Sequence, residues 1–283
     1  MEQRVAIVTG GLRGLGRAMT LGLAGAGVEV LAVGHIASDI PEMEALVAAA
    51  GRSDVVACVA ADIRMPAECD RVIAACTERF GHVDILINNA GLTFTTIAPD
   101  RFRRPEKYRF WEISDDIVQS VMDTNYVAAD RMARRLAPSF VARGWGRIVN
   151  VTTKLSTMNM EGGMPYGASK AALEMATEVW AKELTGTGVT ANVVNPGAGA
   201  NTPGMNQELR DWSREGRVPR LVEPEEMVPP LLFVVSRAAD TVSGYRFDAN
   251  TWDASLPPEQ AARANGVPAG FELHAQDRSA WPA

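Results

Sequence analysis

Residues 5–16 read VAIVTGGLRGLG, and this stretch decides the fold. Its first four residues are all apolar, as in a strand that is buried on both faces of a sheet, and a helical pattern follows over residues 17–26. Between them, Gly10, Gly14 and Gly16 would permit a tight turn, close approach of a pyrophosphate and close packing of the helix. The helix would present its unpaired N–H groups to the phosphates. The stretch predicts a dinucleotide-binding turn; the alternative is a tight turn without a ligand.

The same alternation of short apolar runs and longer helical stretches continues along the chain. Repetition of this kind predicts parallel strands joined by right-handed crossovers. We therefore expect an α/β protein with a doubly wound parallel sheet, a Rossmann fold, in a single domain. The domain is expected to span residues 1–250, and a C-terminal extension, 251–283, to pack on the surface or on a neighbouring subunit. The predicted strands are 5–8, 30–33, 55–59, 85–87, 148–151 and 191–194, and the predicted helices are 17–26, 41–50, 66–80, 116–141 and 165–184.

The composition limits the kinds of partner. The chain has 283 residues and a formal net charge of −6, which argues against nucleic acid or an anionic membrane, because both attract a positive surface. No apolar run reaches the ~18 residues of a membrane-spanning helix, and we expect no signal peptide. Cys58, Cys69 and Cys76 form no C-x-x-C pair and predict neither a disulfide framework nor a metal site. We expect a cytoplasmic protein.

Three further motifs follow the glycine turn in chain order. They are Asn88-Asn89-Ala90-Gly91, Tyr166-x3-Lys170 and Asn195-Pro196-Gly197. Together with the turn, this order resembles that of the short-chain dehydrogenases/reductases, over residues 5 to about 250. The resemblance implies a seven-stranded Rossmann domain, NAD(P)-dependent interconversion of a carbonyl and an alcohol, and a homotetramer or homodimer.

Tyr166 and Lys170 are the candidate catalytic pair. Their spacing puts them on one face of a helix, ~6 Å apart along its axis. The pKa of a free tyrosine is ~10, and an ammonium ~4 Å away at an effective dielectric constant of ~20 would lower it by roughly three units. We therefore expect Tyr166 to act as a general acid–base near neutral pH. The resemblance implies that Lys170 also holds the nicotinamide ribose; the alternative is an exposed pair on a helix surface.

The resemblance implies two more catalytic residues. The family has a serine thirteen residues before the tyrosine, and this chain has Thr153 there. Threonine keeps the hydroxyl, so we expect Thr153 to bond the substrate oxygen, with Thr152 and Ser156 as alternative donors. Asn125 matches the family's asparagine that holds a water for proton relay behind the lysine; the alternative is a structural helix kink.

The choice between NAD and NADP depends on the end of the second strand. The sequence there is Val33-Gly34-His35, without the acid that would bond the ribose hydroxyls and repel a 2′-phosphate. Arg13 lies in the glycine turn near the place of that phosphate, and His35 could add a donor. We therefore expect NADP(H), with NAD(H) as the alternative. Asp62 is expected either to bond the adenine or to cap a turn.

Thr202 completes the predicted cofactor site. The family often has a threonine five residues after the proline of its Asn-Pro-Gly motif, but that position is Asn201 here and Thr202 follows it. A loop shifted by one residue would bring Thr202 to the nicotinamide. The residues predicted to contact the cofactor are Gly10, Leu12, Arg13, Gly14, Leu15, Gly16, His35, Asp62, Ile63, Asn89, Ala90, Gly91, Tyr166, Lys170, Pro196, Gly197 and Thr202.

The substrate site is expected to be largely apolar. Its candidate residues suit an apolar carbonyl or alcohol, although ordinary packing is the alternative. Residues 202–222 are expected to form a mobile lid. A basic insert, residues 101–109, would bind a carboxylate or phosphate of the substrate, pair with acids of another subunit, or form a solvated surface. The candidate pocket residues are Thr93, Phe94, Leu155, Met158, Met160, Met205 and Trp212.

The motifs together favour an NADP-dependent oxidoreductase that acts on a small carbonyl or alcohol. Because a fold does not fix a function, a regulatory protein that binds a dinucleotide without turnover is the alternative, and an epimerase or dehydratase is a third possibility.

Overall fold

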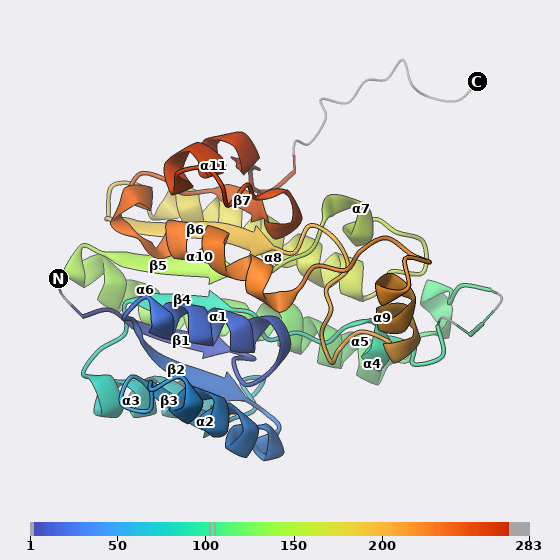
Figure 1. Cartoon of the computed structure of the whole chain (residues 1–283), viewed down its shortest axis with the longest axis horizontal. Coiled ribbons are helices and arrows are strands. Elements are labelled where there is room, and N and C mark those ends of the chain that lie inside the picture. Colours follow the sequence, from blue (N-terminus) through green and yellow to red (C-terminus); the bar gives the residue numbers. More distant parts are fainter. Residues whose placement is uncertain (1–2, 102, 105, 272–283) are drawn as a thin grey trace.

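A mostly parallel sheet forms the centre of the molecule (Figure 1). The computed structural model describes residues 3–101, 103–104 and 106–271, and within them eight strands form one sheet in the order β3-β2-β1-β4-β5-β6-β7-β8. Neighbouring strands are parallel except that β8 is antiparallel to β7. The predicted doubly wound α/β fold is confirmed, with one strand more than the seven expected. The strands are β1 (Val5–Thr9), β2 (Glu29–Gly34), β3 (Val56–Ala60), β4 (Ile85–Asn88), β5 (Gly146–Asn150), β6 (Val189–Asn195), β7 (Tyr245–Asp248) and β8 (Val267–Pro268).

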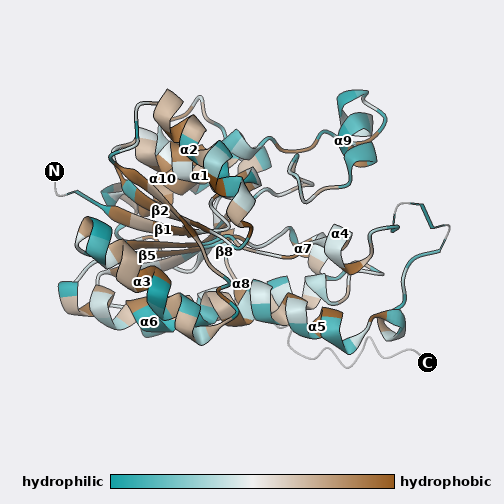
Figure 2. Ribbon diagram, turned by 90° about the horizontal axis from the view of Figure 1, so that it is seen from below, coloured by the Kyte–Doolittle hydropathy of each residue, from teal (hydrophilic) through white to brown (hydrophobic). Residues whose placement is uncertain are grey.

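Helices cover both faces of the sheet, which explains why its central strands are apolar without alternation (Figure 2). In β1, Ala6 and Val8 enter one hydrophobic core, whereas Val5 and Ile7 enter the other. None of the helices in the described residues is long and apolar enough to cross a membrane. One face carries α1 (Gly14–Gly25), α2 (Ile40–Ala49) and α10 (Val228–Val235), and the other carries α3 (Pro66–Phe80), α6 (Ala128–Arg143) and α8 (Tyr166–Glu183).

The helix predicted over residues 116–141 is not uniform. It consists of α5 (Asp115–Met122), a π-helical segment (Asp123–Val127) and then α6. The wide turn holds Asn125, whose side chain is fully buried. A π-bulge inside an α-helix is often found at a functional site, and this one contacts the segment that follows β4, as described below.

Three short helices lie beyond the carboxyl ends of the strands (Figure 1). They are α4 (Phe94–Ile97), α7 (Leu155–Met158) and α9 (Gln207–Arg214), which follow β4, β5 and β6 in the chain. Ligands of open α/β sheets bind at this edge of the sheet. The loops that contain these helices line the candidate site described below.

The start of the C-terminal extension packs on its own chain. Helix α11 (Pro258–Asn265) contacts α10 and β7, and β8 adds to the edge of the sheet. Ala261 and Ala269 are buried there. Residues 272–283 lie outside the described residues, and the division of the chain at residue 250 stays a prediction.

Candidate active site

The glycine turn has the backbone that the sequence predicts. Gly10 and Gly14 have φ angles of 64° and 56°, a region that favours glycine. A Cβ on Gly16 would collide with the carbonyl oxygen of Gly10. Because α1 begins at Gly14, its N-terminal N–H groups lie at the turn. Side chains are thus excluded where a pyrophosphate would approach the backbone, so the turn fits a dinucleotide.

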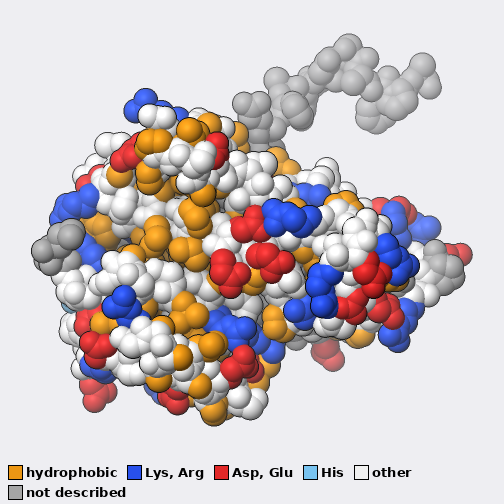
Figure 3. Space-filling model, in the orientation of Figure 1, with side chains coloured by type: hydrophobic (Ala, Val, Ile, Leu, Met, Phe, Trp, Pro, Cys, Tyr) orange, Lys and Arg blue, Asp and Glu red, His pale blue; other side chains and the backbone are white. Residues whose placement is uncertain are grey.

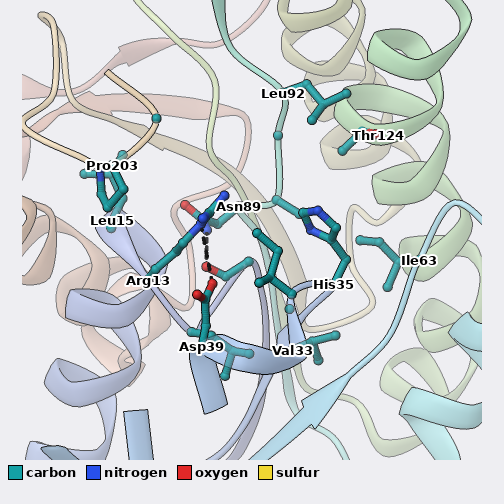
Figure 4. Close-up of a pocket in the computed structure, with 18 of the residues that line it drawn as sticks. Arg13, Leu15, Val33, His35, Asp39, Ile63, Asn89, Leu92, Thr124 and Pro203 are labelled. Atoms are coloured by element: carbon teal, nitrogen blue, oxygen red, sulfur yellow. Dashed lines mark hydrogen bonds and ion pairs between the residues drawn. The ribbon is translucent and has the colours of Figure 1, made fainter. Parts of the chain in front are cut away.

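A cleft beside this turn gathers most of the predicted cofactor residues (Figure 4). Gly16 packs beneath the turn, and a Cβ on Gly197 would collide with Asn250, so these two glycines shape the backbone and do not line the cleft. Tyr166, Lys170 and Pro196 line an adjoining cavity. The predicted residues in the cleft are Gly10, Leu12, Arg13, Gly14, Leu15, His35, Asp62, Ile63, Asn89, Ala90, Gly91 and Thr202.

Two charged residues of the cleft, Asp39 and Arg64, are not identified from the sequence. Asp39 lies a few residues beyond β2, in a 3-10 turn, and its carboxylate is 3.6 Å from Arg13 Nε. Figure 4 shows these two side chains facing each other, with His35 across the cleft. Arg64 also lines the cleft. Its position two residues after Asp62 is the signal that was available in the sequence.

Asp62 has the turn-capping role that was one of its two predicted alternatives. Its carboxylate accepts hydrogen bonds from the backbone N–H of Arg64 at 3.1 Å and from Arg64 Nε at 2.9 Å. The side-chain hydrogen bond from Arg64 lowers the pKa of Asp62. Because Asp62 also lines the cleft, contact with the adenine stays a prediction.

Asn89 and Asn125 hold the segment after β4. Asn89 Nδ2 donates to the carbonyl oxygens of Thr9 and Gly10 at 2.9 and 3.1 Å, which joins this segment to the glycine turn. Asn125 accepts from Leu92 N at 2.7 Å and donates to Leu92 O at 3.1 Å. A Cβ on Gly91 would be 3.3 Å from both Asn125 Oδ1 and Lys170 Nζ. Asn125 Oδ1 and Lys170 Nζ therefore both lie beside Gly91, and the π-helical setting of Asn125 agrees with the structural alternative as well.

Tyr166 and Lys170 lie in the first turns of α8 and line the same cavity. Lys170 is buried, and its Nζ donates to Val151 O at 2.8 Å. Burial lowers the pKa of Lys170 to about 8 and raises the pKa of Tyr166 to about 12. The expectation that Lys170 brings the pKa of Tyr166 toward neutrality is therefore wrong for the protein without a bound cofactor. Desolvation disfavours the phenolate and outweighs the other effects.

Thr153 occupies the place expected for the serine. It is buried, lines the cavity, and makes a side-chain hydrogen bond with Tyr166 that lowers the tyrosine's pKa against the effect of burial. Thr152 also lines the cavity, but its hydroxyl donates to Glu174 Oε2 at 2.7 Å. Ser156 lies outside the lining. The geometry favours Thr153 over both alternative donors.

The cavity beside Tyr166 contains part of the predicted pocket. Thr93, Phe94, Met160 and Met205 line it, whereas Leu155, Met158 and Trp212 do not. Helix α7 and its start instead supply Lys154 and Thr157, and α9 supplies Leu209. The cavity also contains Thr95 and Arg101, so it is more polar and more basic than the sequence analysis predicts.

The segment predicted as a lid borders both the cleft and the cavity. Thr93 and Thr95 donate from their hydroxyls to Gly204 O, each at 2.8 Å. Thr202 lies against Gly14, because a Cβ added to Gly14 would be 3.3 Å from Thr202 Cβ. Residues 202–209 thus contribute to both spaces, and their mobility stays a prediction.

Most cations of the basic insert pair with acids of the same chain. Lys107 and Arg109 bind Glu161 at 2.9 and 3.0 Å, and Arg103 binds Glu208 at 3.1 Å. Figure 3 shows acidic and basic side chains interspersed over this end of the molecule. The insert is therefore largely a surface of intramolecular ion pairs, and Arg101 differs from the rest because it lines the cavity.

Comparisons with known proteins agree with this geometry. Residues 4–214, which contain the lining of the cleft and the cavity, match the family described as short chain dehydrogenase. The chain is 34% identical over 258 residues to 2-dehydro-3-deoxy-D-gluconate 5-dehydrogenase of Escherichia coli, covering 87% of this chain and 93% of that protein. It is 30% identical over 254 residues to the 3-oxoacyl-(acyl-carrier-protein) reductase FabG of Vibrio cholerae, covering 88% and 97%. A solved structure of an actinorhodin polyketide ketoreductase variant with NADPH matches with a TM-score of 0.73 and 27% identity, covering 86% and 94%.

Proposed function

Because the chain belongs to the short-chain dehydrogenase/reductase family, we propose that it is an NADP-dependent oxidoreductase with Tyr166 as its general acid–base. The resemblance that its motifs indicate is confirmed, and the chain is an NAD(P)-dependent enzyme of this family. One observation carries the detailed proposal. Tyr166, Lys170 and Thr153 line one cavity, which shares Leu15, Asn89, Gly91 and Thr93 with the dinucleotide cleft.

Tyr166 would move the proton of the reaction. When bound, the nicotinamide supplies or accepts the hydride. In reduction the Tyr166 hydroxyl donates its proton to the carbonyl oxygen, and in oxidation the phenolate takes a proton back. A pKa of about 12 keeps the hydroxyl protonated at neutral pH, so the proton that reduction requires is in place.

Thr153, Lys170 and Asn125 would assist Tyr166. The Thr153 hydroxyl donates a hydrogen bond to the substrate oxygen and holds it beside the tyrosine. With a pKa of about 8, Lys170 is mostly charged at pH 7, and its charge favours the phenolate in the reverse reaction. We propose that it also holds the nicotinamide ribose. Asn125, whose Oδ1 lies beside Gly91 as Lys170 Nζ does, would hold the water that passes the proton to solvent.

Two arginines and a histidine support a preference for NADP over NAD. Arg13, His35 and Arg64 line the cleft at its β2 and β3 end, where a 2′-phosphate would lie. Asp39 and Asp62 oppose them, but each is paired with an arginine. The acid that would repel the phosphate at the strand end is absent, since β2 ends at Gly34 and His35 follows. The similar ketoreductase was solved with NADPH.

The substrate is proposed to be a small carbonyl or alcohol whose apolar part packs on Phe94, Met160, Met205 and Leu209. A homotetrameric or homodimeric assembly, which is the usual state of the family, is proposed as well, together with a cytoplasmic location.

Absorbance at the reduced-nicotinamide band tests the proposal. Purified protein is mixed with NADPH and a panel of ketones and aldehydes, and with NADP and the matching alcohols. We expect turnover by the natural chain and its loss in Tyr166→Phe. Binding of NADPH without turnover of any member would instead indicate the regulatory alternative.

A further inference from the structure

The cavity beside Tyr166 carries an excess of positive charge. Arg101, Lys154 and Lys170 line it, and no carboxylate does so among the residues that the structure describes. The whole chain has a net charge of −6, so this excess is local. Lys170 has a role in the proposed reaction. The other two cations have none, and the reduction of a neutral carbonyl does not require them.

Arg101 is held inside the cavity wall. Its Nη1 donates to Gly162 O at 2.6 Å, its Nη2 lies 3.8 Å from Met160 Sδ, and its guanidinium carbon is 4.2 Å from the centre of the Phe94 ring. These contacts use two of the five N–H donors of the guanidinium. The side chain is partly buried, and burial lowers its pKa because the cation loses water. Within the described residues it has no carboxylate partner, unlike Arg103 and Arg109 of the same insert.

Phe94 places Arg101 at a short distance from the reacting groups. Its ring contacts Arg101 on one side, and its centre lies 4.7 Å from the centre of the Tyr166 ring. The Phe94 ring is thus the only side chain needed to connect the Arg101 guanidinium with the Tyr166 ring. A substrate whose carbonyl oxygen lies at Tyr166 would reach Arg101 with a group only a few bonds away. Because both residues line the same cavity, such a substrate would not have to leave it.

Resting on the oxidoreductase activity proposed above, we propose that Arg101 binds the carboxylate of the substrate, so that the enzyme reduces short oxo acids to hydroxy acids. The carbonyl carbon gains the hydride of NADPH, its oxygen gains the proton of Tyr166, and the carboxylate is unchanged. The planar guanidinium matches a carboxylate in shape and charge. Lys154, which is exposed and lines the same cavity, adds to the positive field. Met160, Met205 and Leu209 cover the apolar carbons between the two ends.

Pairs of acids and esters test this specificity. Pyruvate, acetoacetate and levulinate are each compared with the methyl ester, which keeps the carbonyl and removes the charge. In the natural chain we expect kcat/KM for at least one acid to exceed that for its ester by about tenfold or more, the range of a hydrogen-bonded charge pair. In Arg101→Gln, which keeps a polar side chain and removes the charge, the acid-to-ester ratio of kcat/KM should approach one, with the change in KM. Arg101→Lys should recover part of the preference.

Arg104→Gln is the matched control. Arg104 belongs to the same insert and stacks on an aromatic ring, with its guanidinium carbon 4.0 Å from the centre of Tyr108, but it lies outside the cavity. It should leave the ratio unchanged. The assignment of Arg101 would be overturned if the acid-to-ester ratio of kcat/KM were the same in the natural chain and in Arg101→Gln. It would also be overturned if this ratio fell as much in Arg104→Gln as in Arg101→Gln.

Calorimetry separates this proposal from the proposed function. Levulinate is titrated into the complex with oxidised NADP, which cannot reduce a ketone. Binding that Arg101→Gln loses, without turnover of any carbonyl, would retain the anion site and reject the oxidoreductase. Reduction of neutral ketones, with neither binding nor reduction of the acids, would reject the anion site and retain the oxidoreductase.

Discussion

Arg246 Nη1 lies 2.9 Å from Glu174 Oε1, and both side chains are almost completely buried beneath the cavity. The pair positions the site, because Arg246 Nη2 donates to Thr153 O at 3.1 Å and Glu174 accepts from the Thr152 hydroxyl. It also joins β7 to α8. The backbone that carries Thr153 is therefore held by a buried ion pair from two other elements.

Removing one partner of this pair should be costly. Glu174→Ala removes the fully buried partner of Arg246 and leaves the cation with Asp248, at 3.3 Å, so we expect the free energy of unfolding to fall by about 3 kcal/mol. Urea denaturation followed by circular dichroism measures the change. Lys182→Gln is the control, because it breaks an exposed i, i+4 pair on the same helix and should cost about 0.5 kcal/mol or less. A loss for Glu174→Ala as small as the control's would contradict the role of the pair.

The Thr153 hydroxyl, and not the threonine methyl, should matter for catalysis. Thr153→Ser should retain kcat/KM within a few-fold, whereas Thr153→Ala should lower it by about 10²-fold or more, since a donor to the developing oxyanion is lost. Steady-state kinetics with any accepted carbonyl measures both. Ser156→Ala should behave like the natural chain, because Ser156 lies outside the cavity. If Ser156→Ala lost activity and Thr153→Ala kept it, the assignment would be wrong.

The rate of reduction should decrease at alkaline pH. The pKa of Lys170 is lowered to about 8, so the ammonium loses its proton as the pH rises through that value, while Tyr166 with a pKa of about 12 stays protonated. We expect log(kcat/KM) for reduction to be level below pH 8 and to fall above it as the Lys170 charge is lost. The pH profile of Lys170→Met should be low and lack this descending limb. A descending limb that persists in Lys170→Met would assign it to another group.

Arg13 and Asp39 should tune the cofactor preference in opposite directions. Arg13→Ala removes a cation from the proposed 2′-phosphate site, and we expect KM for NADPH to rise about tenfold with little change for NADH. Asp39→Asn removes the negative charge paired with Arg13 and should favour NADPH further. The ratio of kcat/KM for the two cofactors is the measurement. Equal effects of Arg13→Ala on NADPH and NADH would mean that Arg13 does not read the phosphate.

Two glycines of α1 provide a matched test of the turn. In Gly16→Ala the new methyl would collide with the Gly10 carbonyl, whereas a Cβ on Gly25 would have no atom within 4 Å. We expect Gly16→Ala to weaken NADPH binding severely and lower stability. Gly25→Ala should bind NADPH normally and gain about 0.5–1 kcal/mol of stability from helix propensity. Cofactor titration by fluorescence and thermal unfolding distinguish them, and normal binding by Gly16→Ala would contradict the geometry.

The parts of the fold that follow simple burial were predictable. Residues of β1 are apolar on both faces because helices cover both sides, and the run therefore marks a strand. β7 has no such run, since Arg246 and Asp248 belong to it, and the buried Arg246 forms ion pairs with Asp248 and with Glu174 of α8, which is far away in the sequence. Helix α10 reads VPPLLFVV, apolar on all sides and with two prolines in its first turn, so no helical period is visible.

The residues of the site also fall into those that local sequence features predict and those that they do not. Glycines and the Tyr166–Lys170 spacing are local features, and the sequence places them correctly. Arg101 reaches the cavity through an irregular insert that no periodicity describes. The direction of the Tyr166 pKa was predicted wrongly for a related reason. The charge of Lys170 can be read from the sequence, whereas the burial that dominates depends on elements far apart in the chain.

Strand β8 has a consequence for how these molecules behave at high concentration. An exposed sheet edge offers backbone donors and acceptors to a second molecule and promotes aggregation. In the described part of the chain, the border beyond β7 is closed by a strand of two residues, one of which, Pro268, has no N–H to offer. β8 therefore offers a neighbouring chain too few backbone hydrogen-bonding groups to add a further strand. In this way the C-terminal extension protects this edge of the sheet against edge-to-edge polymerisation.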